Sequence, residues 1–449
     1  MGKLFGTDGI RGVVGENLTA DLAFRTGKAI AAVLKEEKGR KPVITIGKDT
    51  RISSDMLESA LIAGICSVGG DVMPFGVLPT PAVAYLTVLK GADAGIVISA
   101  SHNPYEHNGI KVFNEKGYKL PDAIEEQVEE KILTDIYPAA THGEIGVLRH
   151  GLRQSREAYI DHLAGTIEGD LSGLRVLVDC SNGASSATAP ELFGRFRCFC
   201  DFIHREPDGV NINDGCGSTH LKSLSEGVVA GGYDLGIAFD GDADRCLLVD
   251  ETGHTIDGDK VMAVCGADLR RHGKLSGNAI VATVMSNLGL HEYCRKEGIE
   301  LVCTAVGDRH VLEKMLECGY AIGGEQSGHT IFRDYATTGD GELTALQFLQ
   351  ALHVSGLPVS EFVSCCRQYP QELINVAVPH SGGVKERIMA DETVWAQVRE
   401  REAALAGEGR ILLRPSGTEA LIRVMVEAKT VELAHEVATD LADFIKKLV

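Results

Sequence analysis

The sequence predicts an α/β protein with three successive βαβ-type domains, whose sheets are mixed, followed by a C-terminal α+β domain. Three observations predict this fold class. At 449 residues the chain is too long for one hydrophobic core. Apolar, β-branched runs alternate with segments of helical periodicity over its first three quarters, which is typical of βαβ units. Residues 366–449 instead show strand-like runs followed by one amphipathic helix, which is typical of an α+β domain.

The expected elements follow from these patterns in chain order. Short runs rich in Val, Ile and Leu predict strands at Pro42–Lys48, Ala94–Ala100, Leu174–Asp179, Leu235–Asp240, Cys246–Asp250, Ala279–Met285, Leu301–Ala305 and Tyr320–Gly323. Apolar residues at helical spacing predict helices at Thr19–Leu34, Asp55–Ser67 and Lys260–Leu269. In the last part we expect strands at Glu372–Val378, Arg410–Arg414 and Leu421–Ala428, and a helix at Val431–Leu448. Loop-like stretches near residues 137–146, 251–257 and 355–369 predict domains at 1–150, 151–252, 253–365 and 366–449.

Charge and composition exclude several classes of function. The net charge is −19 and no basic tract offsets it, so we expect neither a nucleic-acid partner nor an anionic membrane. Twelve cysteines are present, but no two have C-x-x-C spacing, which favours reduced thiols over a zinc or disulfide framework. The sequence begins without an apolar signal region, and no window is long enough to span a bilayer. These features predict a cytoplasmic protein.

A serine hydroxyl follows the apolar run Ala94–Ile98. The segment Ser101-His102-Asn103-Pro104 must turn, because proline removes a donor and restricts the residue before it. Lys111 follows about ten residues later, on the expected return of the loop. A serine–histidine pair also occurs in ordinary turns, and no G-x-S-x-G elbow supports an esterase. Together with a carboxylate cage, this serine is better suited to accept a phosphoryl group.

Such a cage is predicted at Asp240, Asp242 and Asp244, which end the apolar run Leu235–Phe239. Three carboxylates so close repel one another unless a hard cation binds, and ligation by oxygen alone suits Mg²⁺. An EF-hand is excluded because Arg245 stands where that loop requires Gly, and because the flanks are strand-like. A solvated acidic turn remains the structural alternative. If the cage binds a metal, Arg245 next to it could hold a phosphate beside that metal.

Three further loops carry polar groups between small residues. Glu325 and Ser327, in Gly323–His329, could bond sugar hydroxyls. Two arginines flank the Pro415–Glu419 turn, and this turn can form a phosphate nest or be simply a tight turn. The nest residues are Arg414, Ser416, Gly417, Thr418 and Arg423. Phe5–Gly12 is Gly-rich without a dinucleotide fingerprint, and its Arg11 is a candidate for a further phosphate contact.

These five motifs, in this order, resemble the α-D-phosphohexomutase superfamily from Phe5 to about Arg423. The resemblance implies four domains around one central cleft, carrying in turn the phosphoserine, metal-binding, sugar-binding and phosphate-binding loops. It implies that Ser101 carries the phosphoryl group, and that one Mg²⁺ per subunit is held by the three aspartates and a phosphoserine oxygen. It also implies catalytic roles around the transferring group for Arg11, His102, Lys111, Arg245 and His329. Lys111, His102 and His329 all remain candidates for proton transfer.

Within that superfamily the chain looks like the bacterial branch that acts on glucosamine phosphates. Phe5–Gly12, Asn211–Asn213 with Cys216–His220, and Gly324–His329 carry this resemblance. It departs from the branch's usual pattern at Leu221, where Pro is usual, and at His107, where an acid is common. The implied reaction interconverts glucosamine 6-phosphate and glucosamine 1-phosphate through a bound 1,6-bisphosphate, on the route to UDP-N-acetylglucosamine and cell-wall precursors.

A glucosamine or glucose 1,6-bisphosphate would serve as activator, and a sugar phosphate and a second copy of the chain are the expected partners. The alternatives are a phosphomannomutase or phosphoglucomutase with the same mechanism, a phosphatase in which water attacks the phosphoserine, and a sugar-phosphate sensor. A sensor is disfavoured because a pure binder needs neither a nucleophile nor a metal cage.

Overall fold

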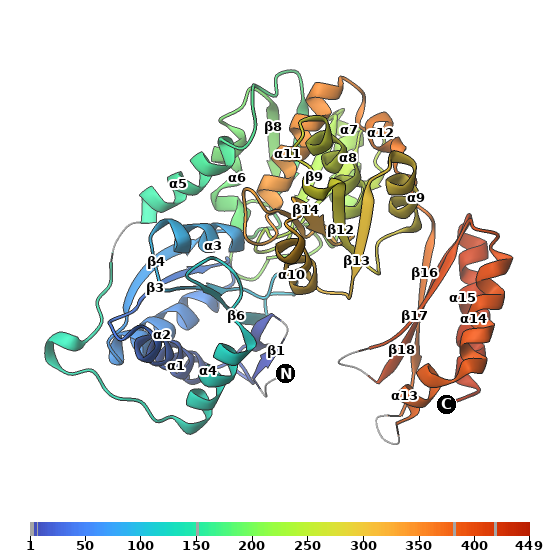
Figure 1. The fold of residues 1–449 in the computed structure, drawn as a ribbon. Helices are drawn as coiled ribbons and strands as arrows, with labels where there is room; N and C mark the ends of the chain where they lie inside the picture. Colours follow the sequence, from blue (N-terminus) through green and yellow to red (C-terminus); the bar gives the residue numbers. More distant parts are fainter. Residues whose placement is uncertain (1–3, 7, 150–151, 380–382, 417–419) are drawn as a thin grey trace. The chain divides into compact units, whose positions relative to one another are not determined.

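The structure is a computed structural model that describes residues 4–6, 8–149, 152–379, 383–416 and 420–449 (Figure 1). It divides into two compact units. Unit 1 comprises Met1–Met285 and Glu300–Ser364, and unit 2 comprises Ser286–Ile299 and Cys365–Val449. Unit 1 contains three mixed sheets, and unit 2 contains a small antiparallel sheet.

The first sheet of unit 1 has six strands in the order β1-β2-β6-β5-β3-β4. The strands are β1 Phe5–Gly6, β2 Gly9–Val13, β3 Val43–Lys48, β4 Asp71–Val77, β5 Ala94–Ile98 and β6 His107–Asn114. Strand β3 pairs in parallel with β4 and β5, whereas β6 runs antiparallel to both β5 and β2. All five residues of β5 are buried, which explains its uninterrupted apolar run.

Two further sheets repeat this plan of a parallel centre with an antiparallel edge. The second has the order β11-β10-β9-β7-β8, and the third β13-β12-β14-β15. Their strands are β7 Arg175–Asp179, β8 Phe199–Ile203, β9 Leu235–Phe239, β10 Cys246–Asp250, β11 Thr255–Ile256, β12 Ala279–Thr283, β13 Glu300–Thr304, β14 Ile322–Gly324 and β15 Thr330–Phe332. In the second sheet β9 runs parallel to β7 and antiparallel to β10, so the β9–β10 connection lies at the carboxyl end of β7.

Helices cover these sheets and bury their apolar faces. The helices of unit 1 are α1 Ala20–Lys38, α2 Ser54–Ser67, α3 Thr80–Leu89, α4 Asp122–Thr134, α5 Leu152–Ala164, α6 Ala189–Phe193, α7 Lys222–Gly231, α8 Gly258–Arg271, α10 Asp308–Cys318, α11 Gly341–Ser355 and α12 Val359–Phe362. On one face of the first sheet, α1, α2 and α4 close the largest apolar cluster, whereas α3 packs on the opposite face (Figure 1). Side-chain caps start several of them; Thr19 accepts a hydrogen bond from Leu22 N at the start of α1.

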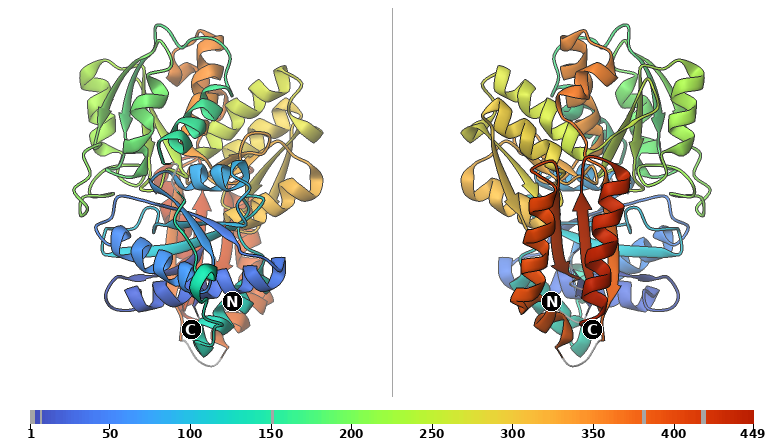
Figure 2. Two further views of the ribbon diagram at one scale, coloured as in Figure 1. Left: turned by 90° about the vertical axis from the view of Figure 1, so that its left-hand side faces the viewer. Right: turned by 90° about the vertical axis from the view of Figure 1, so that its right-hand side faces the viewer.

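In unit 2 the sheet order is β16-β18-β17, and all pairs are antiparallel. The elements are α9 Leu288–Glu297, β16 Gln371–Ala377, α13 Val384–Ala390, α14 Glu392–Ala404, β17 Arg410–Pro415, β18 Leu421–Glu427 and α15 Val431–Lys446. Helices α14 and α15 lie side by side on one face of the sheet (Figure 2). Their apolar sides and the inward residues of the strands form a separate core.

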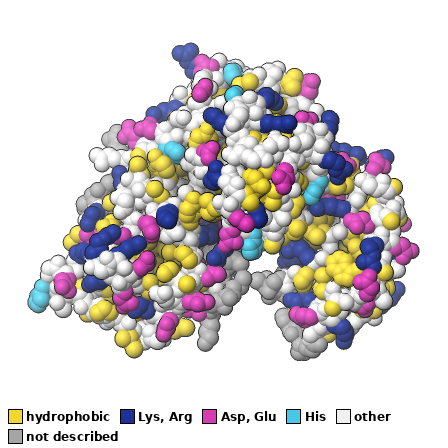
Figure 3. All heavy atoms as spheres, in the orientation of Figure 1, with side chains coloured by type: hydrophobic (Ala, Val, Ile, Leu, Met, Phe, Trp, Pro, Cys, Tyr) yellow, Lys and Arg dark blue, Asp and Glu magenta, His cyan; other side chains and the backbone are white. Residues whose placement is uncertain are grey.

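The fold class predicted from the sequence is confirmed, and every strand and helix named above forms within a few residues of its expected limits. The return from the serine loop, for which the sequence analysis named no strand, is strand β6 and pairs with β5. In the face drawn in Figure 3, acidic and basic side chains are interspersed. Among the described residues, no helix is long and apolar enough to cross a membrane.

Candidate active site

Ser101 lies in the turn that follows β5, and its backbone is left-handed with φ of 52°. A residue with a Cβ adopts this conformation at a cost of about 1–2 kcal/mol. Three hydrogen bonds hold it there. Its N–H donates to Ser99 Oγ at 2.9 Å, and its carbonyl accepts from Arg51 at 3.1 Å and from Asn213 Nδ2 at 3.0 Å. The backbone is therefore fixed from both the first and the second sheet.

The three aspartates lie in the β9–β10 hairpin. Each offers a carboxylate oxygen within 4.8 Å of the others, and all three side chains are buried. Ser101 Oγ donates a hydrogen bond of 2.5 Å to Asp240 Oδ2. The hairpin approaches the serine closely at Gly241, where a Cβ would lie 2.6 Å from the Ser101 carbonyl oxygen. Glycine is thus required between the first two aspartates.

The structure itself, apart from any resemblance to a family, indicates that this cage suits a divalent cation. Asp242 Oδ1 and Asp244 Oδ1 are buried, and neither has a hydrogen-bond partner among the described residues. Such orphan carboxylate oxygens are costly unless a cation binds them. Every donor in the cage is oxygen, the ligand type that Mg²⁺ prefers. Burial, together with the charges of Asp244 and Asp242, raises the pKa of Asp240 well above its ordinary value, and a bound cation would reverse that effect.

Lys111 supplies the positive charge next to the cage. It lies on β6, and its Nζ is 2.9 Å from Asp242 Oδ2, 3.6 Å from Asp244 Oδ2 and 3.3 Å from Asp8 Oδ2. Burial alone would lower the pKa of the ammonium, but the three carboxylates outweigh it and raise that pKa. Lys111 is therefore a fixed cation at neutral pH, suited to electrostatic stabilisation rather than to accepting a proton.

His102 is the histidine beside Ser101, with Nδ1 3.4 Å from Ser101 Oγ. Burial and the nearby cations Arg245 and Arg11 lower its pKa to about 4. The ring is therefore neutral at physiological pH, and one of its nitrogens is free to accept a proton.

His329 is buried between two acids. Its Nδ1 lies 3.7 Å from Asp244 Oδ2, and its Nε2 lies 3.7 Å from Asp308 Oδ2. Burial would lower its pKa, but these carboxylates raise it to about 9. However, the Gly339 N–H donates to Nε2 at 3.1 Å, and a protonated nitrogen could not accept that bond. The ring proton therefore lies on Nδ1, facing Asp244.

A cavity of about 930 Å³ opens in front of these groups. It is lined by residues of the β1–β2 hairpin, the serine loop, α4, the β9–β10 hairpin, the segment at the start of α10 and the loop after β14. Ser101, His102, Arg11, Arg245, Glu325 and His329 all line it. Glu325 is fixed by accepting a hydrogen bond of 3.2 Å from Gly307 N. Ser327 is exposed and is not part of this lining.

The residues expected to hold the distal phosphate lie in unit 2. Arg414 and Arg423 are paired across β17 and β18. Burial and the charge of Arg423 lower the pKa of Arg414, as expected of two cations held together. Ser416 is buried, and its carbonyl accepts a hydrogen bond of 2.8 Å from Lys385 Nζ, a third cation that the sequence analysis missed. Gly417 and Thr418 lie outside the described residues.

The comparison with family models covers nearly the whole chain. Models of the phosphoglucomutase/phosphomannomutase family match its α/β/α domain I at residues 2–138, domain II at 157–253, domain III at 257–369 and the C-terminal domain at 373–444. The chain belongs to the phosphoglucomutase/phosphomannomutase family. The resemblance found in the sequence is therefore confirmed.

Individual relatives within this family are similar over full length. A protein of Acetivibrio thermocellus named phosphoglucosamine mutase is 51% identical over 449 residues, covering 100% of this chain and 99% of its own. One of Clostridium botulinum with the same name is 50% identical over 451 residues, with complete coverage of both chains. A solved family member from Burkholderia thailandensis has the same fold, with a TM-score of 0.81 at 24% identity, covering 99% of this chain and 97% of that one.

Several residues that build the family site here were not found from the sequence. Arg51 and Asn213 hold the serine loop from two different sheets. Asp8 pairs with Lys111, and Thr80 Oγ1 donates to Asp242 Oδ2 at 2.7 Å. Asp8 and Asn213 lie inside motifs named in the sequence analysis. Their roles could not be predicted, because each contacts a residue that is distant in the sequence.

Proposed function

We propose that this chain is a phosphoglucosamine mutase, an isomerase that interconverts D-glucosamine 6-phosphate and α-D-glucosamine 1-phosphate. The mechanism rests on the position of the Ser101 hydroxyl. Its Oγ lies 2.5 Å from Asp240 Oδ2, and two carboxylate oxygens of the same aspartate cage have no hydrogen-bond partner among the described residues. The relatives at 50–51% identity over full length support the choice of sugar. The runner-up is a mutase for mannose or glucose phosphates with the same mechanism.

In the proposed reaction, phosphorylated Ser101 transfers its phosphoryl group to the free hydroxyl of the bound sugar phosphate. The bond between phosphorus and Oγ breaks, a bond between phosphorus and the sugar oxygen forms, and the hydroxyl proton passes to a nearby base. Neutral His102, which lines the cavity beside Oγ, has the charge state that this step needs. The bisphosphate then reorients, and its other phosphoryl group returns to Ser101 Oγ.

The cage aspartates and a phosphate oxygen on Ser101 would hold Mg²⁺, which, when bound, offsets charge on the transferring phosphoryl group. Lys111 is fixed as a cation by its carboxylate neighbours, and Arg245 lines the cavity, so both can stabilise the same developing charge. Arg11, also in the lining, would contact the phosphate from the hairpin side.

The distal phosphate is proposed to bind the loop between β17 and β18, through Arg414, Ser416, Gly417, Thr418 and Arg423. Two in-register arginines supply the charge and the forked donors that a phosphate dianion requires. Lys385 joins them as an additional candidate. Glu325 and Ser327 are proposed to bond the sugar hydroxyls, and the cavity lining supports Glu325.

The deciding experiment follows the two sugar phosphates by ³¹P NMR with Mg²⁺ and a trace of 1,6-bisphosphate. We expect glucosamine 1-phosphate to be converted with a higher kcat/KM than glucose or mannose 1-phosphate. Ser101→Ala should lose at least about 10³-fold in kcat, because the covalent step requires Oγ. Ser327→Ala is the comparison variant and should affect KM alone. Near-wild-type turnover by Ser101→Ala would refute the covalent step, and stoichiometric release of inorganic phosphate would identify a phosphatase.

The same proposal includes activation by a glucosamine or glucose 1,6-bisphosphate, which would phosphorylate Ser101 and leave as a monophosphate. It places the enzyme on the route to UDP-N-acetylglucosamine. The homodimer and the cytoplasmic location expected from the sequence stay predictions.

A further inference from the structure

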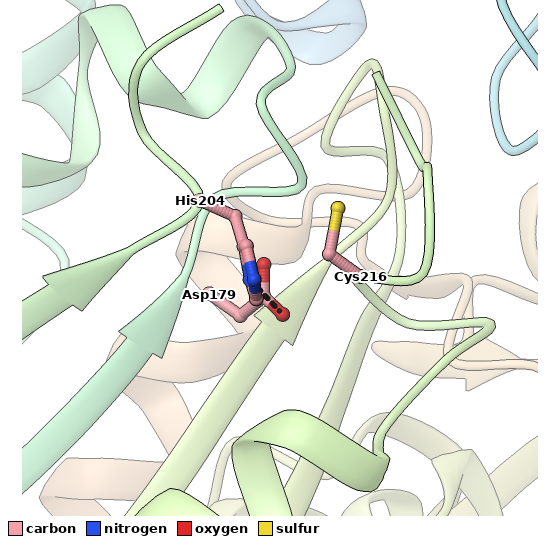
Figure 4. A group of neighbouring side chains, drawn as sticks. All are labelled: Asp179, His204 and Cys216. Carbon is pink, nitrogen blue, oxygen red and sulfur yellow. Dashed lines mark ion pairs between the residues drawn. The ribbon is translucent and has the colours of Figure 1, made fainter. Parts of the chain in front are cut away.

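A second group of side chains of the types that bind metals lies at the second sheet, apart from the aspartate cage (Figure 4). Asp179 is the last residue of β7, His204 follows β8, and Cys216 lies in the loop that precedes α7. These three residues offer a carboxylate oxygen, an imidazole nitrogen and a sulfur atom within 4.8 Å of one another. The proposed mutase reaction uses none of them.

The histidine of this group has an unusual contact. Its Nδ1 lies 3.0 Å from Asp179 Oδ2, as Figure 4 shows by a dashed line. This nitrogen is buried, and its alignment with the described residues is too poor for a hydrogen bond. The contact is therefore a close ion pair, which a cation bound by both side chains would replace.

We propose that Asp179, His204 and Cys216 form a second cation site, specific for a thiophilic divalent ion such as Zn²⁺. Zn²⁺ takes sulfur, nitrogen and carboxylate oxygen in tetrahedral sites, whereas Mg²⁺ prefers oxygen alone. The two sites therefore select different ions. Because the His204 side chain is 31% exposed, a water molecule can reach the fourth position.

Binding requires a small rearrangement and the loss of protons. Bonds of about 2.0 Å to nitrogen and oxygen and about 2.3 Å to sulfur place tetrahedral ligands closer together than 4.8 Å, so the Cys216 side chain must move inward. Its neighbours Gly215 and Gly217 both have positive φ, at 62° and 72°.

Burial and the charges of Asp179 and Asp214 raise the pKa of the Cys216 thiol to about 12, so the metal-free thiol is protonated. Metal coordination displaces that proton to solvent and leaves a thiolate.

The proposed site is connected to the nucleophile by a short chain of hydrogen bonds. Asp179 Oδ1 accepts from Ser181 N at 2.8 Å, and Ser181 Oγ donates to Asn213 Oδ1 at 2.6 Å. Asn213 Nδ2 then donates to the carbonyls of Ser101 and Asn103, each at 3.0 Å. Occupancy of the cation site would therefore act on the loop that fixes Ser101.

The test uses Co²⁺ as a spectroscopic probe, added to purified full-length protein in excess Mg²⁺ so that the aspartate cage is occupied. The background is Cys198→Ser/Cys200→Ser, because the Sγ atoms of this pair lie 3.2 Å apart and could bind soft metals themselves. We expect one Co²⁺ per chain with a thiolate charge-transfer band, displaced by Zn²⁺. Cys216→Ser should abolish the band, and His204→Gln should weaken Co²⁺ binding at least tenfold.

His272→Gln is the matched control, since that histidine is exposed and its ring contacts only Asp268, in the preceding helix, among the described residues. A second measurement protects the test from misfolding. Zn²⁺ should raise the thermal midpoint of the background protein and of His272→Gln, but not that of His204→Gln. The proposal is overturned if no charge-transfer band forms, if the band survives in Cys216→Ser, or if His204→Gln binds as tightly as the control. Each outcome is independent of mutase activity, so it does not bear on the proposed reaction.

Discussion

Replacing Asn213 by alanine tests how the serine loop is held. The amide donates to the Ser101 and Asn103 carbonyls and accepts from Ser181 Oγ, and the residue is 6% exposed. Two buried hydrogen bonds and one partly buried one, at about 0.5–1.5 kcal/mol each, predict a loss of about 1.5–4.5 kcal/mol of stability. The left-handed Ser101 would then lose one of the contacts that offset its strain.

Misplacement of Oγ by about 1 Å is expected to lower kcat by about 10²-fold. KM for the sugar phosphate should change less than threefold, because Asn213 bonds the backbone behind the nucleophile. Steady-state kinetics and calorimetry on the same preparation measure both effects. Asn211→Ala is the matched control, since among the described residues its side chain bonds only Asp208 and Glu206 of its own loop. Asn182 bonds its main-chain carbonyl, which the substitution keeps. If Asn213→Ala lost stability as predicted but kept kcat within twofold of wild type, the positioning argument would be refuted.

Three other changes probe the rest of the site. Excess chelator should abolish turnover and added Mg²⁺ should restore it; full activity in chelator would exclude a metal role. Arg414→Ala should raise KM about 10- to 100-fold with little change in kcat, because a charge-assisted bond contributes about 1.5–3 kcal/mol, and an unchanged KM would count against the phosphate nest. Gly183→Ala should cost about 1–3 kcal/mol and lower kcat, since its Cβ would lie 2.4 Å from the Gly241 carbonyl oxygen in the metal loop. Gly143→Ala, whose Cβ would meet nothing within 4 Å, is its control, and equal effects in both variants would contradict the argument.

The helices and strands that could be predicted are those whose apolar residues form an unambiguous pattern along the sequence. Strands such as Ala94–Ile98 and Leu235–Phe239 are buried on both faces and therefore form continuous apolar runs. Strand β6 was missed because Asn108, Gly109 and Lys111 interrupt its apolar pattern. Each interruption has a structural reason. Lys111 faces the carboxylates, Asn108 bonds Ser53 and Ser54, and a Cβ at Gly109 would lie 2.6 Å from Ser99 O.

In the candidate site, too, residues in local sequence motifs could be predicted, whereas residues that act through contacts distant in sequence could not. Ser101 and the cage aspartates were found because each motif is a run of chemically distinctive residues at the end of one strand. Arg51 could not be found this way, because a single arginine in a loop is ordinary on a surface. Only the fold buries it against Asp49 and directs it toward the Ser101 carbonyl. Its role depends on a contact between residues 50 positions apart.

The position of the Ser101 hydroxyl thus depends on the packing of one sheet's loops against those of another. The Ser101 carbonyl accepts from Arg51 on the first sheet's side and from Asn213 in the second sheet's loop. The metal hairpin approaches the same oxygen so closely that only glycine fits at position 241. Thr80, at the start of α3, fixes Asp242 through both its backbone N–H and its hydroxyl. Because the Asn213, Gly241 and Thr80 contacts each join the first sheet's loops and helices to those of the second, neither sheet alone can hold Oγ and the aspartates at their observed spacing. Substitutions at this boundary should therefore lower kcat even where they lie outside the cavity.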